Sequence, residues 1–382
     1  MSDDAPKVPE PDRVDGAPHP RETTALYGQD AAERAFLDAW AAGRLHHAWL
    51  LRGSRGVGKA TLAYRIARAR LAHDDGAALL GPAAPATLAL DPENPVARRI
   101  AAAGEPRLKT VVRGLATKSG TTTPVTPYRL RTEITVDAVR ALGAFLHLSA
   151  ADGGWRVVIV DPADELNRAA ANAFLKMLEE PPPRVLMLLL AHSPGRLLPT
   201  IRSRCRTLDL APLGPADLAR ALAEAGAAPE TPEALAALSG GSPGEALRLQ
   251  AENAPALYAR LVALLAGAPG LDRADLVRLT EEADGRDAGE RAAVIGRLTA
   301  LLLQRLARAA LLGPGPEAAP GEAALPARLA PDAAAARVWA ETAAEVEAKA
   351  RRARALNLDP GAAIFDMWLA IDAASRRART AA

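Results

Sequence analysis

The chain has 382 residues, a formal net charge of +2 and one cysteine, Cys205. A single cysteine excludes an internal disulfide and a cysteine-based zinc site, and the balanced charge neither indicates nor excludes a nucleic-acid partner. No segment has the apolar length of a membrane span, and the first residues lack the basic flank and apolar core of a secretory signal. We therefore expect a cytoplasmic protein of two or three domains.

The N-terminal half has the pattern of a parallel α/β domain. Residues 1–22 are rich in Pro, Asp and Glu, which predicts a disordered tail. Over residues 23–210, near-continuous apolar runs alternate with helical patterns, which is typical of parallel strands covered on both faces. The strands are expected at 48–51, 156–160 and 185–191. Residues 74–132 interrupt this pattern and are expected to form an irregular insertion.

The C-terminal half is helical in pattern. Residues 211–253 predict a small helical domain that begins soon after Pro212. Residues 254–382 have Leu, Ala and Val at helical spacing, with Arg and Glu between them, which predicts a larger all-helical domain.

Residues Gly53–Lys59 match the phosphate-binding loop G-x-x-x-x-G-K between an expected strand and an expected helix. The backbone amides of such a loop and the following helix N-terminus favour phosphate, and Lys59 would reach the outer phosphates. Ala60 stands where the motif offers a hydroxyl to magnesium. We therefore expect ATP or ADP as a weakly bound ligand that is not hydrolysed. The residues expected to bind it are Gly53, Gly56, Gly58, Lys59, Thr61 and Asp161.

Asp161 directly follows the apolar segment 156–160. In phosphate-binding-loop proteins a carboxylate at this place lies near magnesium, and ATP-hydrolysing members usually follow it with Glu. Here Pro162 follows, so general-base help of roughly 10²–10⁴-fold is missing from that position. The sequence thus indicates a site without catalysis of its own. The simpler alternative is that Asp161 only closes a strand ahead of a turn.

Two further segments carry a resemblance. An amphipathic helix is expected from Asn167 to Glu180, before three prolines, and Ser203-Arg204-Cys205 follows the third strand. With Gly28-Gln29 and the phosphate-binding loop ahead of them, these segments resemble bacterial clamp-loader AAA+ subunits over about residues 26–250. The resemblance implies an α/β P-loop AAA+ sheet domain, then a small helical lid and an all-α C-terminal collar.

The resemblance also implies a function. Some subunits of this family lack a working ATPase site yet keep the arginine of Ser-Arg-Cys, so Arg204 is expected to act as an arginine finger in trans on a neighbour's ATP. The implied partners are gamma/tau and delta clamp-loader subunits in a hetero-oligomeric ring, with the sliding clamp and primed DNA reached through the complex. The implied process is ATP-dependent clamp loading in chromosomal replication. Membership in the DNA-directed DNA polymerase holoenzyme would describe the complex, because the chain shows no polymerase site.

Other positions depart from the family pattern. Relatives carry a four-cysteine zinc module where this chain has a basic region over residues 98–131, so no zinc and no other metal is expected. A solvated or partner-facing surface is the favoured interpretation of that region over a DNA site. Gly244 or Glu245 stands where motor subunits carry a nucleotide-sensing arginine, and His192 and Ser193 are weaker candidates for sensing phosphate.

Two alternatives stay open from the sequence. The first is a catalytically active AAA+ ATPase of the gamma/tau motor type, in which Thr61 replaces the missing hydroxyl and Asp164 or Glu165 the missing base. The second is a small-molecule P-loop kinase, for which Ser203-Arg204-Cys205 and the helical domains have no evident use.

Overall fold

The computed structural model describes residues 8–14, 16–73, 84–117, 121, 123–126, 128–147, 154–283, 285 and 288–381. The chain divides into two compact units, the first comprising Met1–Ala228 and Ser242–Leu247, the second Pro229–Gly241 and Arg248–Ala382. No helix in the described ranges is long and apolar enough to cross a membrane. The boundaries predicted from the sequence at 210/211 and 253/254 stay a prediction.

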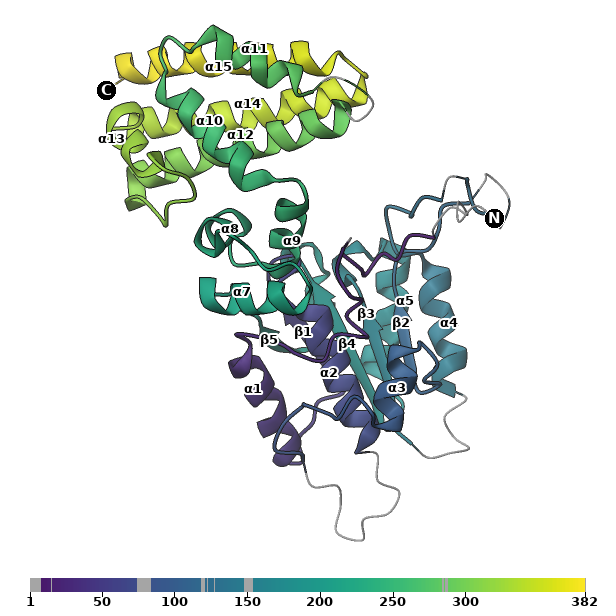
Figure 1. The fold of residues 1–382 in the computed structure, drawn as a ribbon. Helices are drawn as coiled ribbons and strands as arrows, with labels where there is room; N and C mark the ends of the chain where they lie inside the picture. Colours follow the sequence, from purple (N-terminus) through teal and green to yellow (C-terminus); the bar gives the residue numbers. More distant parts are fainter. Residues whose placement is uncertain are drawn as a thin grey trace, which may run out of the picture. The chain divides into compact units, whose positions relative to one another are not determined.

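A five-stranded parallel sheet forms the centre of the first unit, in the order β2-β3-β4-β1-β5 (Figure 1). The strands are β1 (Ala48–Arg52), β2 (Leu108–Val111), β3 (Arg156–Val160), β4 (Val185–Ala191) and β5 (Arg206–Asp209). Because every neighbouring pair is parallel, all carboxyl ends meet at one edge of the sheet and all amino ends at the other. The predicted α/β fold is confirmed, and its three predicted strands are β1, β3 and β4.

Helices cover both faces of this sheet. The first unit contains α1 (Asp30–Ala41), α2 (Lys59–Ala72), α3 (Pro95–Ala101), α4 (Val136–His147), α5 (Arg168–Glu179), α6 (Pro199–Arg202), α7 (Pro215–Glu224) and the start of α9 (Pro243–Ala251), with short 3-10 turns at Ala163–Glu165 and Pro194–Arg196. On one face, Phe174 of α5 and Leu142 of α4 pack with Val158 and Met187, all fully buried. On the other, Phe36 of α1 lies 5.1 Å from the ring of Trp49. This burial explains the near-continuous apolar runs of β3 and β4.

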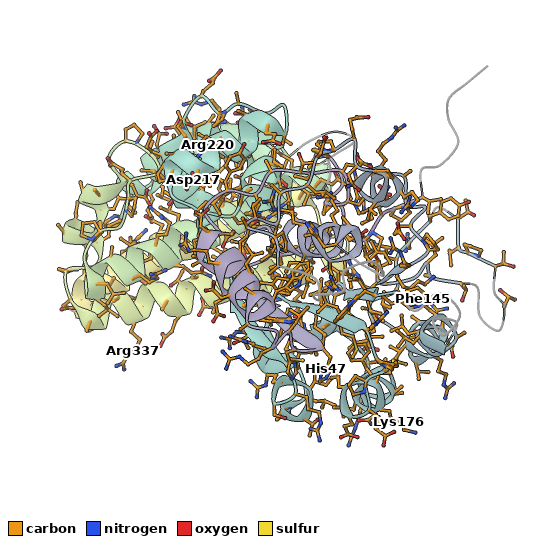
Figure 2. All side chains as sticks on the ribbon, turned by 90° about the horizontal axis from the view of Figure 1, so that it is seen from below. His47, Phe145, Lys176, Asp217, Arg220 and Arg337 are labelled. Carbon is orange, nitrogen blue, oxygen red and sulfur yellow. The ribbon has the colours of Figure 1, made fainter. Side chains whose placement is uncertain are left out.

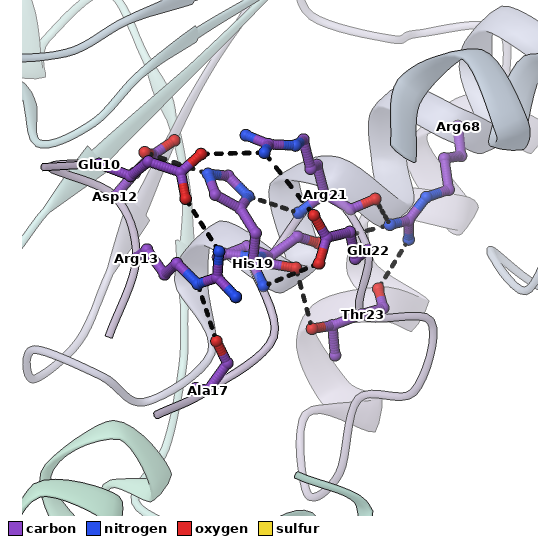
Figure 3. Close-up of polar contacts among 10 residues, drawn as sticks. Glu10, Asp12, Arg13, Ala17, His19, Arg21, Glu22, Thr23 and Arg68 are labelled. Atoms are coloured by element: carbon purple, nitrogen blue, oxygen red, sulfur yellow. Dashed lines mark hydrogen bonds and ion pairs between the residues drawn. The ribbon is translucent and has the colours of Figure 1, made fainter. Parts of the chain in front are cut away.

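The segment before α1 lies along α2 and is bonded to it (Figure 3). Buried Arg68 donates hydrogen bonds to the carbonyls of Arg21 at 2.6 Å and Thr23 at 2.9 Å. The ring of buried His19 accepts from the Arg21 amide and pairs with Asp12 at 3.1 Å. We call residues 8–14 and 16–24 the strap. The predicted disordered tail, 1–22, overlaps it, and the structure differs there because a buried guanidinium needs acceptors, which the strap supplies.

The predicted insertion, 74–132, contains regular structure in its described part. Strand β2 pairs in parallel with β3, from Leu108 opposite Val157 to Val111 opposite Val160. Beyond β2, the chain runs out and back on itself, and the two passes are joined by isolated antiparallel bridges at Leu115–Leu130 and Thr117–Pro124. Residues 74–83, 118–120, 122 and 127 of this prediction lie outside the described ranges.

The second unit is helical, as the sequence predicted. It comprises α8 (Pro232–Ser239), the end of α9, α10 (Ala254–Ala266), α11 (Arg273–Glu281), α12 (Ala288–Leu312), α13 (Leu325–Leu329), α14 (Ala333–Ala355) and α15 (Pro360–Ala381), with a 3-10 turn at Glu322–Ala324. Helix α14 packs against both α12 and α15, and α10 packs against α12. A buried carboxylate, Glu322, accepts hydrogen bonds from Tyr258 and Arg305, both at 2.6 Å. These bonds tie α10 and α12 to the turn before α13.

Candidate nucleotide cradle and arginine finger

The phosphate-binding loop lies where the motif predicts it, at the carboxyl edge of the sheet. Strand β1 ends at Arg52 and α2 begins at Lys59, with Gly58 as its N-cap in a left-handed conformation at φ 108°. A β-carbon on Gly53 would lie 2.9 Å from the carbonyl oxygen of Leu210. The loop therefore needs glycine for close backbone packing as well as for its conformation.

A second glycine contact closes over the loop. The Gly244 amide donates to the Gly56 carbonyl at 3.0 Å, and the Ser242 hydroxyl donates to the Arg55 carbonyl at 2.7 Å. A β-carbon on Gly244 would lie 2.9 Å from Cα of Gly56, so a side chain there would push the two backbones apart. The position where a motor subunit is expected to carry a sensing arginine thus serves here as a backbone contact with the loop itself.

Lys59 is turned back onto its own loop. Its Nζ donates to the carbonyl oxygens of Gly53 and Ser54, both at 2.7 Å, and the residue is 3% exposed. Burial lowers the pKa of Lys59 to about 8, against the opposing effect of nearby Asp161. The ammonium is therefore still mostly protonated at neutral pH, and its hydrogen bonds are already made within the chain.

Asp161 lies at the carboxyl end of β3, in the same cavity as Lys59. Burial raises its pKa to about 7, and the carboxylate of Asp12 adds to the shift. Hard cations bind the ionised form of a carboxyl group, so a proton competes with magnesium for Asp161 near neutral pH.

The two candidate replacements for the missing base, Asp164 and Glu165, are engaged elsewhere. The carboxylate of Asp164 accepts hydrogen bonds from the amides of His192 and Ser193, both at 3.0 Å. Glu165 forms an ion pair with Arg113 at 2.8 Å. Neither carboxylate is thus available as a general base without first losing these partners.

A cavity of about 310 Å³ brings most of the predicted binding residues together. Its lining includes Gly56, Gly58, Lys59, Thr61 and Asp161. Gly53 is not part of the lining; its carbonyl oxygen accepts a hydrogen bond from Lys59, which is part of it.

Several charged residues that the sequence did not assign to this site also line the cavity, among them Asp12, Arg55 and Arg113. Arg55 lies inside the motif at a variable position. Asp12 belongs to the segment predicted as a tail. Arg113 was only one member of a basic region, and no local pattern connects it with a loop 60 positions away.

His192 also lines the cavity, and it provides a test of fit for a nucleotide. Burial lowers its pKa to about 4, with a further contribution from Lys59, so the ring is neutral at physiological pH. Its Nδ1 is buried without a hydrogen-bond partner in the described part of the chain. An unpaired ring nitrogen beside a lysine fits the oxygen-rich phosphate end of a nucleotide, while Ala60 offers magnesium no oxygen. Among the described residues, no cluster of His, Cys, Asp or Glu could hold a metal ion.

Arg204 lies at the opposite edge of the sheet from this cradle. It sits between α6 and β5, so it precedes the amino end of a parallel strand, whereas the loop follows the carboxyl end of β1. Its amide donates to the Ile201 carbonyl at 3.1 Å. Next to it, Cys205 packs against the core, and burial raises the thiol pKa to about 12. A partly buried residue packed against the core thus anchors the turn, while the Arg204 side chain stays 38% exposed.

Much of the predicted basic region is paired within the chain. Arg99 and Arg107 both form ion pairs with buried Glu105, at 2.8 and 2.9 Å. Arg131 donates to the Leu115 carbonyl and to the Thr117 hydroxyl, both at 3.1 Å. Lys118 lies outside the described ranges. These contacts favour a structural role for the region.

Comparisons with known proteins find relatives of this chain among DNA polymerase III subunits. Residues 28–214 match the family described as "DNA polymerase III, delta subunit". DNA polymerase III subunit delta' of Pseudomonas aeruginosa is 45% identical over 141 residues, which are 36% of this chain and 42% of the relative. The Escherichia coli subunit delta' is 44% identical over 130 residues, 33% of this chain and 39% of the relative. DNA polymerase III subunit gamma of Buchnera aphidicola is 27% identical over 199 residues, 52% of this chain and 47% of the relative. The chain thus spans less than half the length of these relatives.

Proposed function

Since the chain belongs to the clamp-loader AAA+ family, as a DNA polymerase III delta-prime subunit, we propose that it supports ATP-dependent loading of the sliding clamp by lending Arg204 to a neighbouring ATPase subunit. In this function the chain is a stator. It contributes a cation to the neighbour's nucleotide and does not hydrolyse ATP itself. The similarity to delta-prime subunits reaches 44–45% identity over 130–141 residues, which supports the stator. Over matches of 194–199 residues, a delta-prime subunit at 29% and a gamma subunit at 27% are nearly equal.

The position of Arg204 carries this proposal. An arginine at the amino edge of a parallel sheet is on the wrong side to reach phosphates held at the carboxyl edge of the same sheet. Its side chain is partly exposed, and its turn is fixed by backbone hydrogen bonds and by Cys205. Such a group is placed to serve an anion on another protomer, and the planar, permanently charged guanidinium suits a phosphate.

The chain's own cradle supports the second half of the proposal. Lys59 is satisfied by its own loop, Asp161 is half protonated near neutral pH, and Ala60 has no oxygen for magnesium. We propose that ATP or ADP is held here weakly and without turnover. The backbone amides of the loop and Lys59 would hold the phosphates, and neutral His192 would offer them a ring N–H.

The partners follow from the proposed function. They are gamma/tau and delta subunits in a hetero-oligomeric ring, with the clamp and primed DNA reached through the complex. The second unit, with its long packed helices α12, α14 and α15, would form the collar that joins the ring.

An active motor subunit is the second candidate. In its favour, Thr61 lines the cavity and carries a hydroxyl. However, both substitutes for the base are paired elsewhere in the chain, Asp164 with backbone amides and Glu165 with Arg113. Hydrolysis by the purified chain alone would favour this candidate.

The decisive experiment is Arg204→Ala in a loader reconstituted with its partner subunits, clamp and primed DNA. Arginine fingers contribute on the order of 10³–10⁵ in rate. We therefore expect single-turnover hydrolysis at the adjoining site to fall by about 10³-fold or more, with loss of clamp loading. Arg202→Ala is the matched control, because Arg202 is exposed and ends α6 two positions earlier. A loader that is indifferent to Arg204→Ala would refute the proposal.

A further inference from the structure

The guanidinium of Arg204 is held by two acceptors in its own chain. Nη1 donates to the Thr200 carbonyl at 3.0 Å, and Nη2 pairs with Oε1 of Glu179 at 2.8 Å. Thr200 belongs to α6, one turn before the finger, and Glu179 is the last residue of α5. Since an arginine has five N–H donors, these two contacts leave donors for a second anion.

Glu179 stands where helix stability alone does not favour a carboxylate. The C-terminus of a helix has a partial negative charge, so an acidic residue there is unfavourable. Glu180 follows directly, and Lys176 is the only basic residue in the last turn of α5. The side chain of Lys176 extends outward from the protein (Figure 2). Both side chains of the Glu179–Arg204 ion pair are partly exposed, and exposed ion pairs contribute little to stability.

We propose that Glu179 is a positioning residue for Arg204, a role that rests on the proposed function of Arg204 as an arginine finger. A free arginine samples many rotamers and loses that freedom when it binds phosphate. Contact with Glu179 and Thr200 fixes the side chain before the neighbour arrives, so less ordering is needed at the moment of contact. The carboxylate keeps its bond to Nη2 while the remaining donors face the neighbour's phosphate.

The same contact gives a function to the acidic end of α5. Both α5 and α6 reach the amino edge of the sheet, since α5 leads into β4 and α6 into β5. The prolines at 181–183 end α5 immediately after Glu179 and Glu180, so the carboxylate is fixed at the level of the Ser203–Cys205 turn. The end of α5 and the Ser203–Cys205 turn therefore hold the Arg204 side chain together.

The test is a double-mutant cycle in the assembled loader. We expect Glu179→Gln to lower the single-turnover rate of hydrolysis at the adjoining site by about tenfold, the scale of one charge-assisted hydrogen bond, with KM for ATP unchanged. In an Arg204→Ala background, Glu179→Gln should have no further effect. Glu180→Gln is the matched control and should stay within about twofold of the wild type. Thermal unfolding of the free chain should change little, because the loss of a weak, exposed ion pair is offset by the removal of an unfavourable charge from the helix end.

Three results would overturn the inference. They are an unchanged rate in Glu179→Gln, a raised rate, which would mean that Glu179 restrains the finger, and an equal loss in the presence and absence of Arg204. The proposed function is judged separately. If Arg204→Ala alone leaves hydrolysis unchanged, both proposals fail; if Arg204→Ala abolishes it while Glu179→Gln does not lower it, only the positioning role fails.

Discussion

Asp161 is a carboxyl group that the fold keeps in an unfavourable place. Burial raises its pKa from 3.8 to about 7, and Asp12 adds a like charge nearby. Between these two values the folded state holds a proton that the unfolded state has lost. Stability therefore falls as pH rises through this range, and the full cost is present above about pH 7.

Asp161→Asn should remove this pH dependence. We expect the variant to be more stable than the wild type at pH 8, by on the order of 1–3 kcal/mol, with a smaller gain at pH 5. Urea unfolding at the two pH values measures the difference. Asp164→Asn is the control, because Asp164 accepts two amide hydrogen bonds and its loss should destabilise the fold at both pH values. A gain from Asp161→Asn that does not change with pH would contradict the raised pKa.

At the residue scale, the sequence predicts only part of the cradle. Gly58 and Lys59 follow from the motif, because the loop between a strand and a helix is local in sequence. Asp12 and Arg113 reach the same cavity through the strap and through the chain after β2, and neither placement has a local signal. The turning of Lys59 onto two carbonyls is also invisible in the sequence, since any phosphate-binding loop would contain the same residues.

At the element scale, burial decides which strands the sequence reveals. Strands β1, β3 and β4 are inner strands with continuous apolar runs. Strands β2 (Leu-Lys-Thr-Val) and β5 (Arg-Thr-Leu-Asp) are the outermost strands of the sheet. Their polar side chains face solvent and interrupt the apolar run. The strap has no apolar pattern at all. It is held in place by hydrogen bonds from Arg68 to its backbone carbonyls. Because every residue has a backbone carbonyl, the sequence carries no signal for these bonds.

The strap gives a prediction about the order of this segment. Arg68→Met keeps the length of the side chain on α2 but removes the donors to Arg21 and Thr23. Losing these buried charge-assisted bonds should cost about 2–4 kcal/mol and speed hydrogen exchange over residues 16–24 by about 10²-fold or more. Mass-spectrometric exchange with peptide resolution measures this directly. Arg98→Met is the control, because Arg98 is exposed and its ion pair with Glu93, at 3.8 Å, is long and exposed to solvent. Equal exchange in both variants would show that Arg68 does not hold the strap.

At the scale of the whole molecule, the two edges of one sheet have different chemistry. The carboxyl edge carries a cradle that is closed by its own Lys59, by Gly244 and by the strap. The amino edge carries a partly exposed cation, Arg204, whose turn is fixed by the partly buried Cys205 and whose guanidinium pairs with Glu179. A rigid parallel sheet between them keeps the two edges apart, so loss of catalysis at one edge need not disturb the other. This arrangement suits a stator that acts only through its neighbour.

Magnesium provides the sharpest test of that asymmetry in the isolated chain. Because Ala60 has no oxygen and Asp161 is half protonated near pH 7, ATP should bind weakly, with affinities in magnesium and in EDTA within about threefold of each other. Ala60→Ser restores the hydroxyl and should bring tighter binding in magnesium than in EDTA. It should not bring hydrolysis, since Pro162 offers no base and both Asp164 and Glu165 remain paired. Isothermal titration and a phosphate-release assay measure the two effects separately.

Thr61→Ala completes this test, because Thr61 is the residue that a motor subunit would need in place of Ala60. If the cradle is idle, Thr61→Ala should leave both affinities unchanged, since no magnesium is held there to lose a ligand. If the wild-type chain instead binds ATP tightly only with magnesium and loses this preference in Thr61→Ala, then Thr61 supplies the missing oxygen. The cradle would then be a working one, and the chain would have to be regarded as a motor that also carries an arginine finger.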